Sequence, residues 1–254
     1  MQPQWILACD IDYTLTGDTE ALVQLAEQLS ALRQRGELFL ILPTARTLTD
    51  VLPGFEEEGL PVPDAITTLV GTEIYLPPFS NGMARLPAWD AQLRQSFSRA
   101  EALTFLEDIE GLRMQSDRYN TALKVSCFLD QTPDPPQAAA LIKRRVIEAG
   151  KADIYQVIWS SGRDLDIIPA KAGKGKAVKF ILQHLNLTPQ RVVVAGDTGN
   201  DRTMFEEFLY GIVVGNAQPE LKQLRDDNPG PTVYFAQKSY AAGIEEGLQH
   251  FGLL

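Results

Sequence analysis

The chain has 254 residues, of which 44% are hydrophobic and 22% charged, and its 23 basic and 33 acidic side chains give a net charge of −10. Because an acidic surface repels phosphate backbones and anionic lipids, this balance argues against a nucleic-acid-binding or membrane-surface protein and leaves room for a local basic pocket that binds one phosphate. The two cysteines, Cys9 and Cys127, are too few for a disulfide framework or a four-cysteine zinc site. No basic segment precedes the first apolar run, and Asp10 and Asp12 interrupt that run early. We therefore expect a cytoplasmic protein without a signal peptide or membrane span.

The first part of the chain alternates apolar strands with amphipathic helices. The first helix carries leucines at helical spacing and ends before Gly36. In chain order the predicted elements are a strand at 5–9, a helix at 21–35, a strand at 38–42, a helix at 47–52, a strand at 65–70 and the beginning of a hairpin at 73–75. This alternation indicates a parallel sheet covered by helices.

The middle of the chain loses this regular alternation, and prolines and glycines interrupt it repeatedly. The predicted elements here are a helix at 89–107, a strand at 122–128, a helix at 137–148 and a strand at 155–159. Their grouping indicates an α+β insert at roughly 79–168. We expect its hydrophobic core to be formed by Trp89, Phe97, Leu103, Phe105 and Leu106.

The alternation resumes in the last part of the chain. Helices are predicted at 174–185, 203–208, 219–225 and 240–250, and strands at 191–195 and 211–214. The two outer parts therefore form one sheet domain that the insert interrupts. The predicted fold class is α/β, with a Rossmann-like parallel-sheet core at 1–78 and 169–254 and an inserted α+β domain at 79–168.

Polar segments follow three of the predicted strands and precede one helix; they occupy residues 10–14, 44–46, 196–201 and 173–175. Ligands of open α/β sheets bind beyond the carboxyl ends of the strands, where these segments converge. Each segment alone reads as an ordinary turn, because Asp, Asn, Gly and Thr are common turn residues. All four together, in this order, indicate a functional site.

These side chains fit phosphoryl transfer through an aspartyl-phosphate. Asp197 and Asp201 offer the oxygen ligands that Mg²⁺ prefers, and Lys174 adds positive charge beside a carboxylate nucleophile. Thr44 can donate a hydrogen bond to a phosphate oxygen. Asp12 can protonate the leaving oxygen and later take a proton from the attacking water.

Lys174 has an alternative interpretation, because together with Lys171, Lys176 and Lys179 it could form a solvated basic helix face. Lysines at a helix N-terminus oppose the helix dipole, however, and this favours an anion-binding role. His184 and His250 have no second ligand at helical spacing, so we expect structural or surface roles for them.

In their order the four motifs resemble the haloacid dehalogenase-type phosphatase superfamily, whose signature begins with Asp-x-Asp-x-Thr. The resemblance implies that Asp10 is the nucleophile and Asp12 the general acid/base, with Thr44 and Lys174 completing the catalytic group. It implies a Mg²⁺ cofactor, for which the metal ligands are Asp10, Asp12 (through its carbonyl), Asp197 and Asp201. The implied phosphate-binding residues are Thr44, Ala45, Arg46, Lys174 and Asn200.

The insert lies between the second and third motifs, as in superfamily members with a large α/β cap. Segments 70–75, 159–169 and 216–221 resemble sucrose-phosphatases, and segment 124–126 does so more weakly. The implied substrate-binding residues are Gly71, Thr72, Glu73, Lys124, Ser161, Gly162, Arg163, Asp164, Asp166 and Asn216. Segment 160–164 could also be a plain hairpin turn, and Asp166 could pair with a core charge rather than a sugar hydroxyl.

The sequence departs from the family pattern at a few positions. Ala45 stands where a glycine is usual and Gly173 where an asparagine is usual, and Cys127 and Phe128 replace a more polar pair in the cap. These departures leave the core chemistry intact and leave the substrate open.

The resemblance implies hydrolysis of sucrose 6-phosphate to sucrose and phosphate. The alternatives are another phosphorylated disaccharide or a sugar-glycerate of the mannosyl-3-phosphoglycerate type, and an inactive phosphosugar-binding or interaction domain. The presence of Asp10, Asp12, Lys174 and Asp197 favours an enzyme over the inactive domain. We expect a monomer that binds a small sugar phosphate, with a sucrose-phosphate synthase as a potential partner and a cap that swings over the core.

Overall fold

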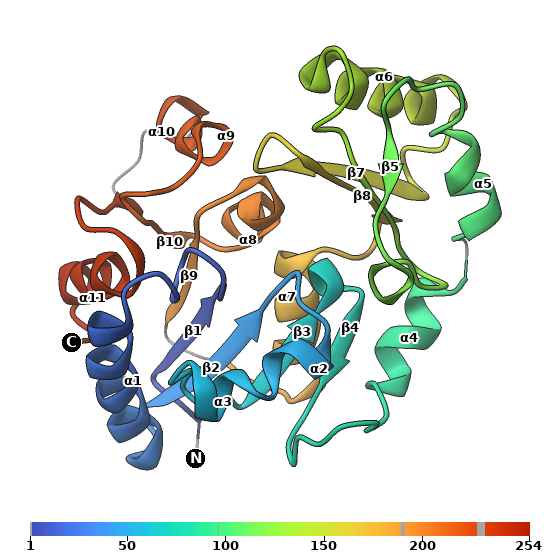
Figure 1. Cartoon of the computed structure of the whole chain (residues 1–254). Helices are drawn as coiled ribbons and strands as arrows, with labels where there is room; N and C mark the ends of the chain where they lie inside the picture. The colour runs from blue at the N-terminus through green and yellow to red at the C-terminus, as the bar shows by residue number, and fades with distance from the viewer. Residues whose placement is uncertain (1, 96, 189–190, 228–231) are drawn as a thin grey trace.

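Two β-sheets of different character build the molecule (Figure 1). The structure is a computed structural model that describes residues 2–95, 97–188, 191–227 and 232–254. A seven-stranded sheet has the order β11-β10-β9-β1-β2-β3-β4, and a four-stranded sheet has the order β5-β6-β8-β7. We call the first sheet with its helices the core and the second sheet with its helices the cap.

The core sheet is parallel except at one edge. Its parallel strands are β1 (Trp5–Cys9), β2 (Leu38–Pro43), β3 (Ala65–Thr68), β9 (Arg191–Gly196), β10 (Tyr210–Val213) and β11 (Val233–Phe235). β4 (Glu73–Tyr75) runs antiparallel to β3 at the edge. β1 lies between β2 and β9, so residues from opposite ends of the sequence become neighbours. All five residues of β1 are buried, as expected for a central strand covered on both faces.

Helices cover both faces of the core sheet. Figure 1 shows α1 (Thr19–Gln34) and α11 (Tyr240–Phe251) on one side of it, and α7 (Lys174–His184) and α8 (Arg202–Glu207) on the other. α1 begins as the sequence predicts, because the Asp18 side chain accepts a hydrogen bond from the Ala21 N–H, and its leucines are buried. Shorter helices connect the strands: α2 (Leu48–Val51), α3 (Gly54–Glu57), α9 (Pro219–Lys222) and α10 (Leu224–Asp227).

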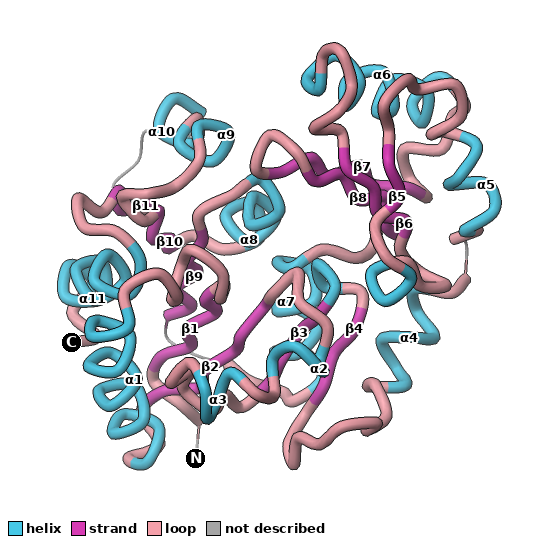
Figure 2. Tube along the Cα trace, in the orientation of Figure 1, coloured by secondary structure: helices cyan, strands magenta, loops and turns pink. Residues whose placement is uncertain are grey.

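The cap sheet is antiparallel, and its two faces differ in polarity. It consists of β5 (Arg113–Met114), β6 (Val125–Phe128), β7 (Tyr155–Ser160) and β8 (Asp164–Pro169), with α5 (Arg99–Thr104) and α6 (Pro135–Glu148) on the side away from the core (Figure 2). Val125, Cys127, Leu165 and Ile167 pack in the hydrophobic cluster under these helices. Side chains alternate along a strand, so the residues between them, which include Ser126 and Asp166, lie on the core-facing side.

Several predicted elements need correction. The single helix predicted at 89–107 is two helices, α4 (Pro87–Leu93) and α5, and the helix predicted at 219–225 is divided into α9 and α10. The strand predicted at 65–70 ends at Thr68, and the one predicted at 122–128 begins at Val125. β4 is the return strand of a hairpin rather than its beginning, and β5, β8 and β11 were not predicted.

Trp89 does not belong to the cap's hydrophobic core. Its indole N–H donates to the Gly71 carbonyl at 3.1 Å, and its ring lies 4.9 Å from the Phe180 ring of α7. It is therefore buried with the core cluster, which places α4 on the core. Phe105 and Leu106 do lie in the cap cluster, and Phe97 and Leu103 pack against it, as predicted.

In the part of the chain that the structure describes, no helix combines the length and apolar character needed to cross a membrane.

Gly71, in the loop after β3, meets Gly173, which lies where the chain returns from the cap to the core. Gly71 has φ +80°, and a Cβ on it would lie 2.4 Å from the Gly173 carbonyl carbon and 2.8 Å from the Lys174 nitrogen. Gly173 precedes the first residue of α7 and has φ +120°. Both backbones favour glycine, and only glycine at 71 lets α7 approach so closely.

We expect Gly71→Ala to lower the free energy of unfolding by about 3 kcal/mol or more, because it adds a backbone clash to the strain of a positive φ. The matched control is Gly82→Ala, since Gly82 has φ +75° but no heavy atom near its missing Cβ. That variant is expected to lose only about 1 kcal/mol. Urea unfolding measures both values, and equal losses would contradict the importance of the close contact.

Candidate active site

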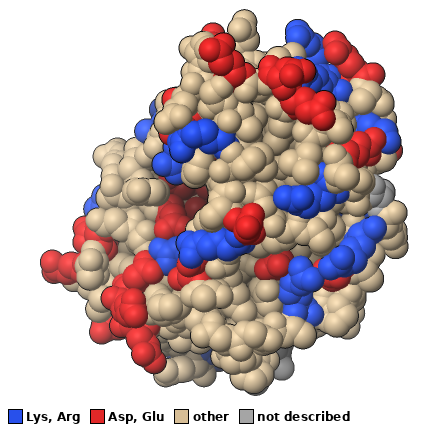
Figure 3. Space-filling model, turned by 45° about the vertical axis from the view of Figure 1, so that its right-hand side comes forward, with Lys and Arg blue, Asp and Glu red and all other residues tan. Residues whose placement is uncertain are grey.

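A cavity of about 600 Å³ lies between the carboxyl ends of the core strands and the polar face of the cap sheet. Figure 3 shows a hollow with acidic atoms inside it and basic side chains nearby. The core residues that line the cavity are Asp10, Asp12, Tyr13, Ala45, Arg46, Asp197, Thr198, Asn200 and Gln218. The cap residues that line it are Gln115, Tyr119, Lys124, Phe128, Ser160, Ser161, Arg163, Asp164 and Asp166.

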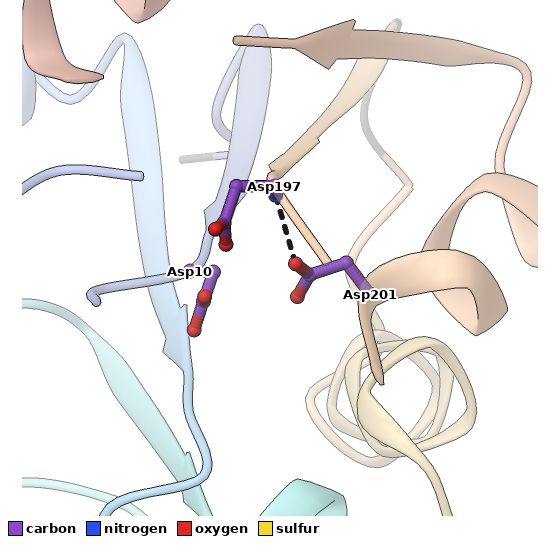
Figure 4. A group of neighbouring side chains, drawn as sticks. All are labelled: Asp10, Asp197 and Asp201. Atoms are coloured by element: carbon purple, nitrogen blue, oxygen red, sulfur yellow. Dashed lines mark hydrogen bonds between the residues drawn. The ribbon is translucent and has the colours of Figure 1, made fainter. Parts of the chain in front are cut away.

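Three buried carboxylates meet at the core end of this cavity (Figure 4). Asp10 follows β1, and Asp197 and Asp201 follow β9; one oxygen of each lies within 4.8 Å of the others. Burial and the neighbouring Asp201 raise the pKa of Asp10 to about 7. Burial, Asp201 and Asp10 raise the pKa of Asp197 to about 9. The cluster is thus an environment that favours added positive charge.

Lys174 supplies part of that charge. Its side chain is fully buried, and its Nζ lies 2.7 Å from Asp10 Oδ1 and 2.6 Å from Asp201 Oδ1. Burial opposes the charged amine, but Asp10 and Asp201 outweigh this effect and raise the pKa of Lys174. The alternative interpretation of Lys174 as part of a solvated basic helix face is therefore excluded.

Asp201 organises the loop after β9. Its Oδ2 accepts hydrogen bonds from the backbone N–H groups of Asp197 (2.9 Å, dashed in Figure 4) and Thr198 (3.0 Å). With Lys174 on its other oxygen, Asp201 has partners on both oxygens. It therefore holds Asp197 and Lys174 in place as well as contributing charge.

Two oxygens near this cluster lack partners among the described residues. Asp197 Oδ1 accepts a hydrogen bond from Thr14 Oγ1 at 3.1 Å, but its buried Oδ2 accepts none, and neither does the buried Oδ1 of Asn200. Buried acceptors are rarely left unpaired. Two orphaned oxygens on residues that line the same cavity as Asp10 form a donor set of the kind that fits a hard divalent cation such as Mg²⁺.

The Asp12 side chain lies outside this carboxylate cluster. It accepts hydrogen bonds from the Arg46 guanidinium, whose Nη2 is 2.8 Å from Asp12 Oδ1, while Nη1 of the same group is 2.5 Å from Glu58 Oε1. Arg46 is therefore engaged by two carboxylates, and its phosphate-binding role stays a prediction. Glu58 was not singled out in the sequence.

Thr44 and Ala45 lie where the second motif predicts. Thr44 is fully buried behind the cavity wall; its N–H donates to Thr67 at 2.8 Å and its Oγ1 accepts from the Arg46 N–H at 3.1 Å. Ala45 itself lines the cavity. These contacts fix the turn after β2, and the Thr44 hydroxyl proton has no protein acceptor among the described contacts.

The cap contributes a row of connected polar groups. Lys124 Nζ lies 2.9 Å from Asp166 Oδ1, and Ser126 Oγ donates to the same carboxylate. Gln115 Nε2 donates to Asp164 at 2.9 Å. Asp166 therefore pairs with a charge of the cap, and not with a charge of the core. The 160–164 segment is a hairpin turn between β7 and β8, and it also lines the cavity.

Five predicted substrate-binding residues lie outside the cavity lining. Gly71 packs against Gly173, Thr72 donates to the Leu69 carbonyl, and Glu73 accepts from Thr68, Tyr75 and Arg85. These three residues shape the junction between core and cap, so their positions do not support direct substrate contact. Asn216 instead donates to the Tyr13 carbonyl, and Gly162 occupies the hairpin turn with φ +64°.

The sequence reasoning missed several residues that line the cavity: Tyr13, Gln115, Tyr119, Ser160, Thr198 and Gln218. Tyr13 and Thr198 lie inside the recognised motifs, and Gln218 lies inside the 216–221 segment, so their positions carried a signal. Gln115 and Tyr119 stand in no motif, and only the folding of the cap brings them to the site.

Two contacts join the cap to the core beside the cavity. The Ser161 N–H donates to Glu220 Oε1 of α9 at 2.9 Å, and Arg118 Nη1 lies 3.1 Å from Asp50 Oδ1 of α2. They connect the cap to two separate core helices, so the described conformation has the cap against the core.

Comparisons with known proteins agree with this geometry. A family model described as sucrose-6F-phosphate phosphohydrolase matches residues 3–252. A mannosylfructose-phosphate phosphatase of Agrobacterium fabrum is 36% identical over 258 residues, covering 100% of this chain and 99% of that protein. Sucrose-phosphatase 1 of Nicotiana tabacum is 31% identical over 262 residues, covering 98% of this chain but only 59% of the tobacco protein. The crystal structure of a Synechocystis sucrose-phosphatase in complex with sucrose and phosphate superposes with a TM-score of 0.86 at 34% identity, covering 98% of both chains.

We expect Lys174→Met to lower the free energy of unfolding by about 3–5 kcal/mol, because it leaves buried carboxylates without their cation. The matched control is Lys179→Met on the same helix, where Lys179 forms a partly exposed ion pair with Glu207 at 2.8 Å. That control is expected to lose at most about 1 kcal/mol. Urea unfolding of both variants near neutral pH checks the difference, and similar losses would contradict the structural role of Lys174.

Proposed function

Because the chain belongs to the sucrose-6F-phosphate phosphohydrolase family, it is a sugar phosphatase of the haloacid dehalogenase superfamily, and we propose that its substrate is sucrose 6-phosphate. The products would be sucrose and phosphate. The observation that carries the proposal is a buried Asp10, held by Lys174, at the base of a cavity whose other wall is the polar face of the cap.

In the proposed first step, a carboxylate oxygen of Asp10 attacks the substrate phosphorus and the bond to the sugar oxygen breaks. Lys174 lies beside Asp10 and can stabilise the negative charge of the transferring group. Asp12, two residues further on, gives a proton to the leaving oxygen. Since its carboxylate accepts from Arg46, this donation requires Asp12 to turn away from that guanidinium.

In the proposed second step, water attacks the phosphorus of the aspartyl-phosphate, and Asp12 takes a proton from that water. Phosphate leaves, and the Asp10 carboxylate is restored. A Mg²⁺ ion held by Asp10, Asp197 and the Asp12 carbonyl, with Asp201 and Asn200 in support, would supply positive charge for both steps. Haloacid dehalogenase-type phosphatases generally use this ion, and the orphaned Asp197 oxygen fits it.

The cap wall supports a sugar substrate because it presents donors and acceptors together. Lys124 uses one of its three N–H donors on Asp166 and can offer the others to hydroxyl groups, while Ser161, Arg163 and Asp164 line the same wall. Glu220 and Asp50, which contact the cap from the core, would hold it closed and keep bulk water from the reacting centre. The expected monomeric state and association with a sucrose-phosphate synthase stay predictions.

A second candidate substrate is mannosylfructose phosphate. The relative with that activity in its name is 36% identical and matches the chain along its whole length. Other disaccharide phosphates and mannosyl-3-phosphoglycerate remain alternatives of the same chemistry. An inactive binding domain is disfavoured, because Asp10, Asp12, Lys174 and Asp197 are all present, Lys174 contacts Asp10, and Asp197 lies in the same carboxylate cluster as Asp10.

Phosphate release from a substrate panel tests the proposal. The panel contains sucrose 6-phosphate, mannosylfructose phosphate, mannosyl-3-phosphoglycerate, glucose 6-phosphate and fructose 6-phosphate. We expect kcat/KM for sucrose 6-phosphate to exceed that for either monosaccharide phosphate by about 100-fold, because two satisfied sugar contacts are each worth about 1–2 kcal/mol. Preference for mannosylfructose phosphate would select the second candidate, and equal turnover across the panel would contradict a dedicated disaccharide phosphatase.

The panel is repeated with Asp10→Asn, which removes the attacking oxygen charge and is expected to lower kcat at least about 1,000-fold. Asp153→Asn, a substitution at an exposed position away from the cavity, serves as the matched control. An Asp10→Asn variant of wild-type rate would exclude the covalent step.

Magnesium is expected to stabilise the wild-type chain against heat, because it binds the folded carboxylate cluster and not the unfolded chain. At a concentration 100 times Kd the midpoint should rise by about 5–10 °C. Asp197→Asn, which replaces the orphaned oxygen, should abolish most of this shift, whereas Asp164→Asn in the cap wall of the same cavity should keep it. Thermal unfolding with and without Mg²⁺ makes the comparison, and equal shifts in both variants would argue against a site at Asp197.

A further inference from the structure

Tyr13 directly follows Asp12 and presents an aromatic ring at the core side of the cavity. It lines the cavity and is 66% exposed, which is unusual for a large aromatic residue inside a functional site. Its backbone lies in the loop that carries the proposed nucleophile and acid/base. Its ring is thus available to a ligand that reaches Asp10.

The aromatic rings on the cap side are already in use. The Phe128 ring lies between Arg113 at 5.2 Å and Arg163 at 5.1 Å, and the Tyr119 ring carries Arg118 at 4.8 Å. Among the described residues, no aromatic or cationic group stacks on Tyr13. Tyr13 is therefore the cavity aromatic whose faces are left for a ligand.

The backbone of Tyr13 is held in a costly conformation. Its φ is +58°, in the left-handed region that glycine or asparagine occupies more easily than an aromatic residue. Such strain persists when neighbours enforce it, and it is found preferentially at functional sites. A glycine would relieve this strain, so the bulky ring at this position does not serve the stability of the loop.

Neighbouring groups enforce the conformation from both sides of the residue. The Tyr13 N–H donates to Thr16 Oγ1 at 3.2 Å, and the Tyr13 carbonyl accepts from Asn216 Nδ2 at 2.7 Å. Asn216 is anchored in turn, because its Oδ1 accepts from the Tyr240 N–H at 2.9 Å at the start of α11. The Tyr13 backbone is thus anchored to residues of the core, through Asn216 to the start of α11, and these contacts do not involve the cap.

We propose that Tyr13 is a specificity-determining residue, whose ring stacks against the apolar face of the sugar that carries the phosphate, and that Asn216 positions it. This proposal rests on the sugar-phosphatase function proposed above. A sugar ring has hydroxyl groups at its edges and C–H groups on its faces. The polar cap wall suits the edges, and an exposed aromatic face suits the C–H groups. Since Tyr13 adjoins Asp12, the stacked unit would be the one next to the leaving oxygen.

The test compares two substrates, sucrose 6-phosphate (or the disaccharide phosphate that the panel selects) and acetyl phosphate, which has no sugar ring. The readout is kcat/KM for the sugar phosphate divided by kcat/KM for acetyl phosphate. We expect Tyr13→Ala to lower this ratio about tenfold, mainly through KM of the sugar phosphate, which corresponds to about 1.4 kcal/mol of lost binding. Tyr13→Phe keeps the ring and should keep the ratio within about twofold of wild type.

Asn216→Asp tests the positioning role. It keeps the acceptor for the Tyr240 N–H and removes the donor to the Tyr13 carbonyl, so the ratio should fall in the same direction as in Tyr13→Ala. A merely structural role would lower both kcat/KM values together and leave the ratio unchanged.

Binding of the product sugar, measured by calorimetry, gives a readout that does not require turnover. Its Kd should rise about tenfold in Tyr13→Ala and stay near the wild-type value in Tyr13→Phe. If the wild-type enzyme prefers the sugar phosphate and Tyr13→Ala keeps both the wild-type ratio and the wild-type Kd, the role of Tyr13 is overturned. The proposed function then still stands. A wild-type enzyme that turns over no sugar phosphate would contradict both.

Discussion

The contact of the Lys174 ammonium with Asp10 and Asp201 is the interaction on which the rest of the site depends. Three carboxylates at the ends of two adjacent buried strands repel one another, and burial makes their charge more costly still. A fully buried lysine at the first turn of α7 offsets this. The helix dipole opposes a cation at that end, so the two carboxylates must outweigh both the dipole and the lost hydration of the amine.

The position of this lysine determines features of the fold that have no chemistry of their own. α7 can bring Lys174 to the strand ends only if its start lies against the loop after β3. The glycines at 71 and 173 permit that approach, and Trp89 fills the adjacent space with its N–H on the Gly71 carbonyl. The loop after β3 therefore also supports Lys174, the proposed catalytic lysine. This gives a structural reason for the identity of residues at the junction that lie outside the cavity lining.

The core and the cap contribute different groups to the cavity: the core contributes the charged cluster, and the cap contributes a polar wall. The core collects carboxylates and a lysine at the place proposed for the reacting phosphorus. The cap sheet, because its strands alternate apolar and polar residues, packs one face under α5 and α6 and turns Lys124, Ser126 and Asp166 toward the cavity. The loop after β1 belongs to both tasks: Asp10 and Asp12 carry the proposed chemistry, and Tyr13 carries an exposed ring. Substitutions in the residues that contact the sugar can therefore change which disaccharide phosphate is bound without changing the carboxylates and the lysine of the core.

The sequence by itself determined the family, the α/β class, most strands of the core sheet and the convergence of Asp10, Lys174, Asp197 and Asp201. These features are encoded locally, in apolar runs and helical spacing, and parallel strands bring their carboxyl ends to one edge whatever the loops do. Only the tertiary structure decided which groups pair at that edge. Arg46 is held by Asp12 and Glu58, Asp166 by Lys124, Trp89 joins the core cluster, and Gly71 meets Gly173. It also decided that Tyr13 stays exposed at the cavity while Thr72 and Glu73 do not reach it. Such pairings depend on how whole layers pack, because the partners come from different strands and helices. No local pattern in the sequence indicates which of these distant residues will come into contact.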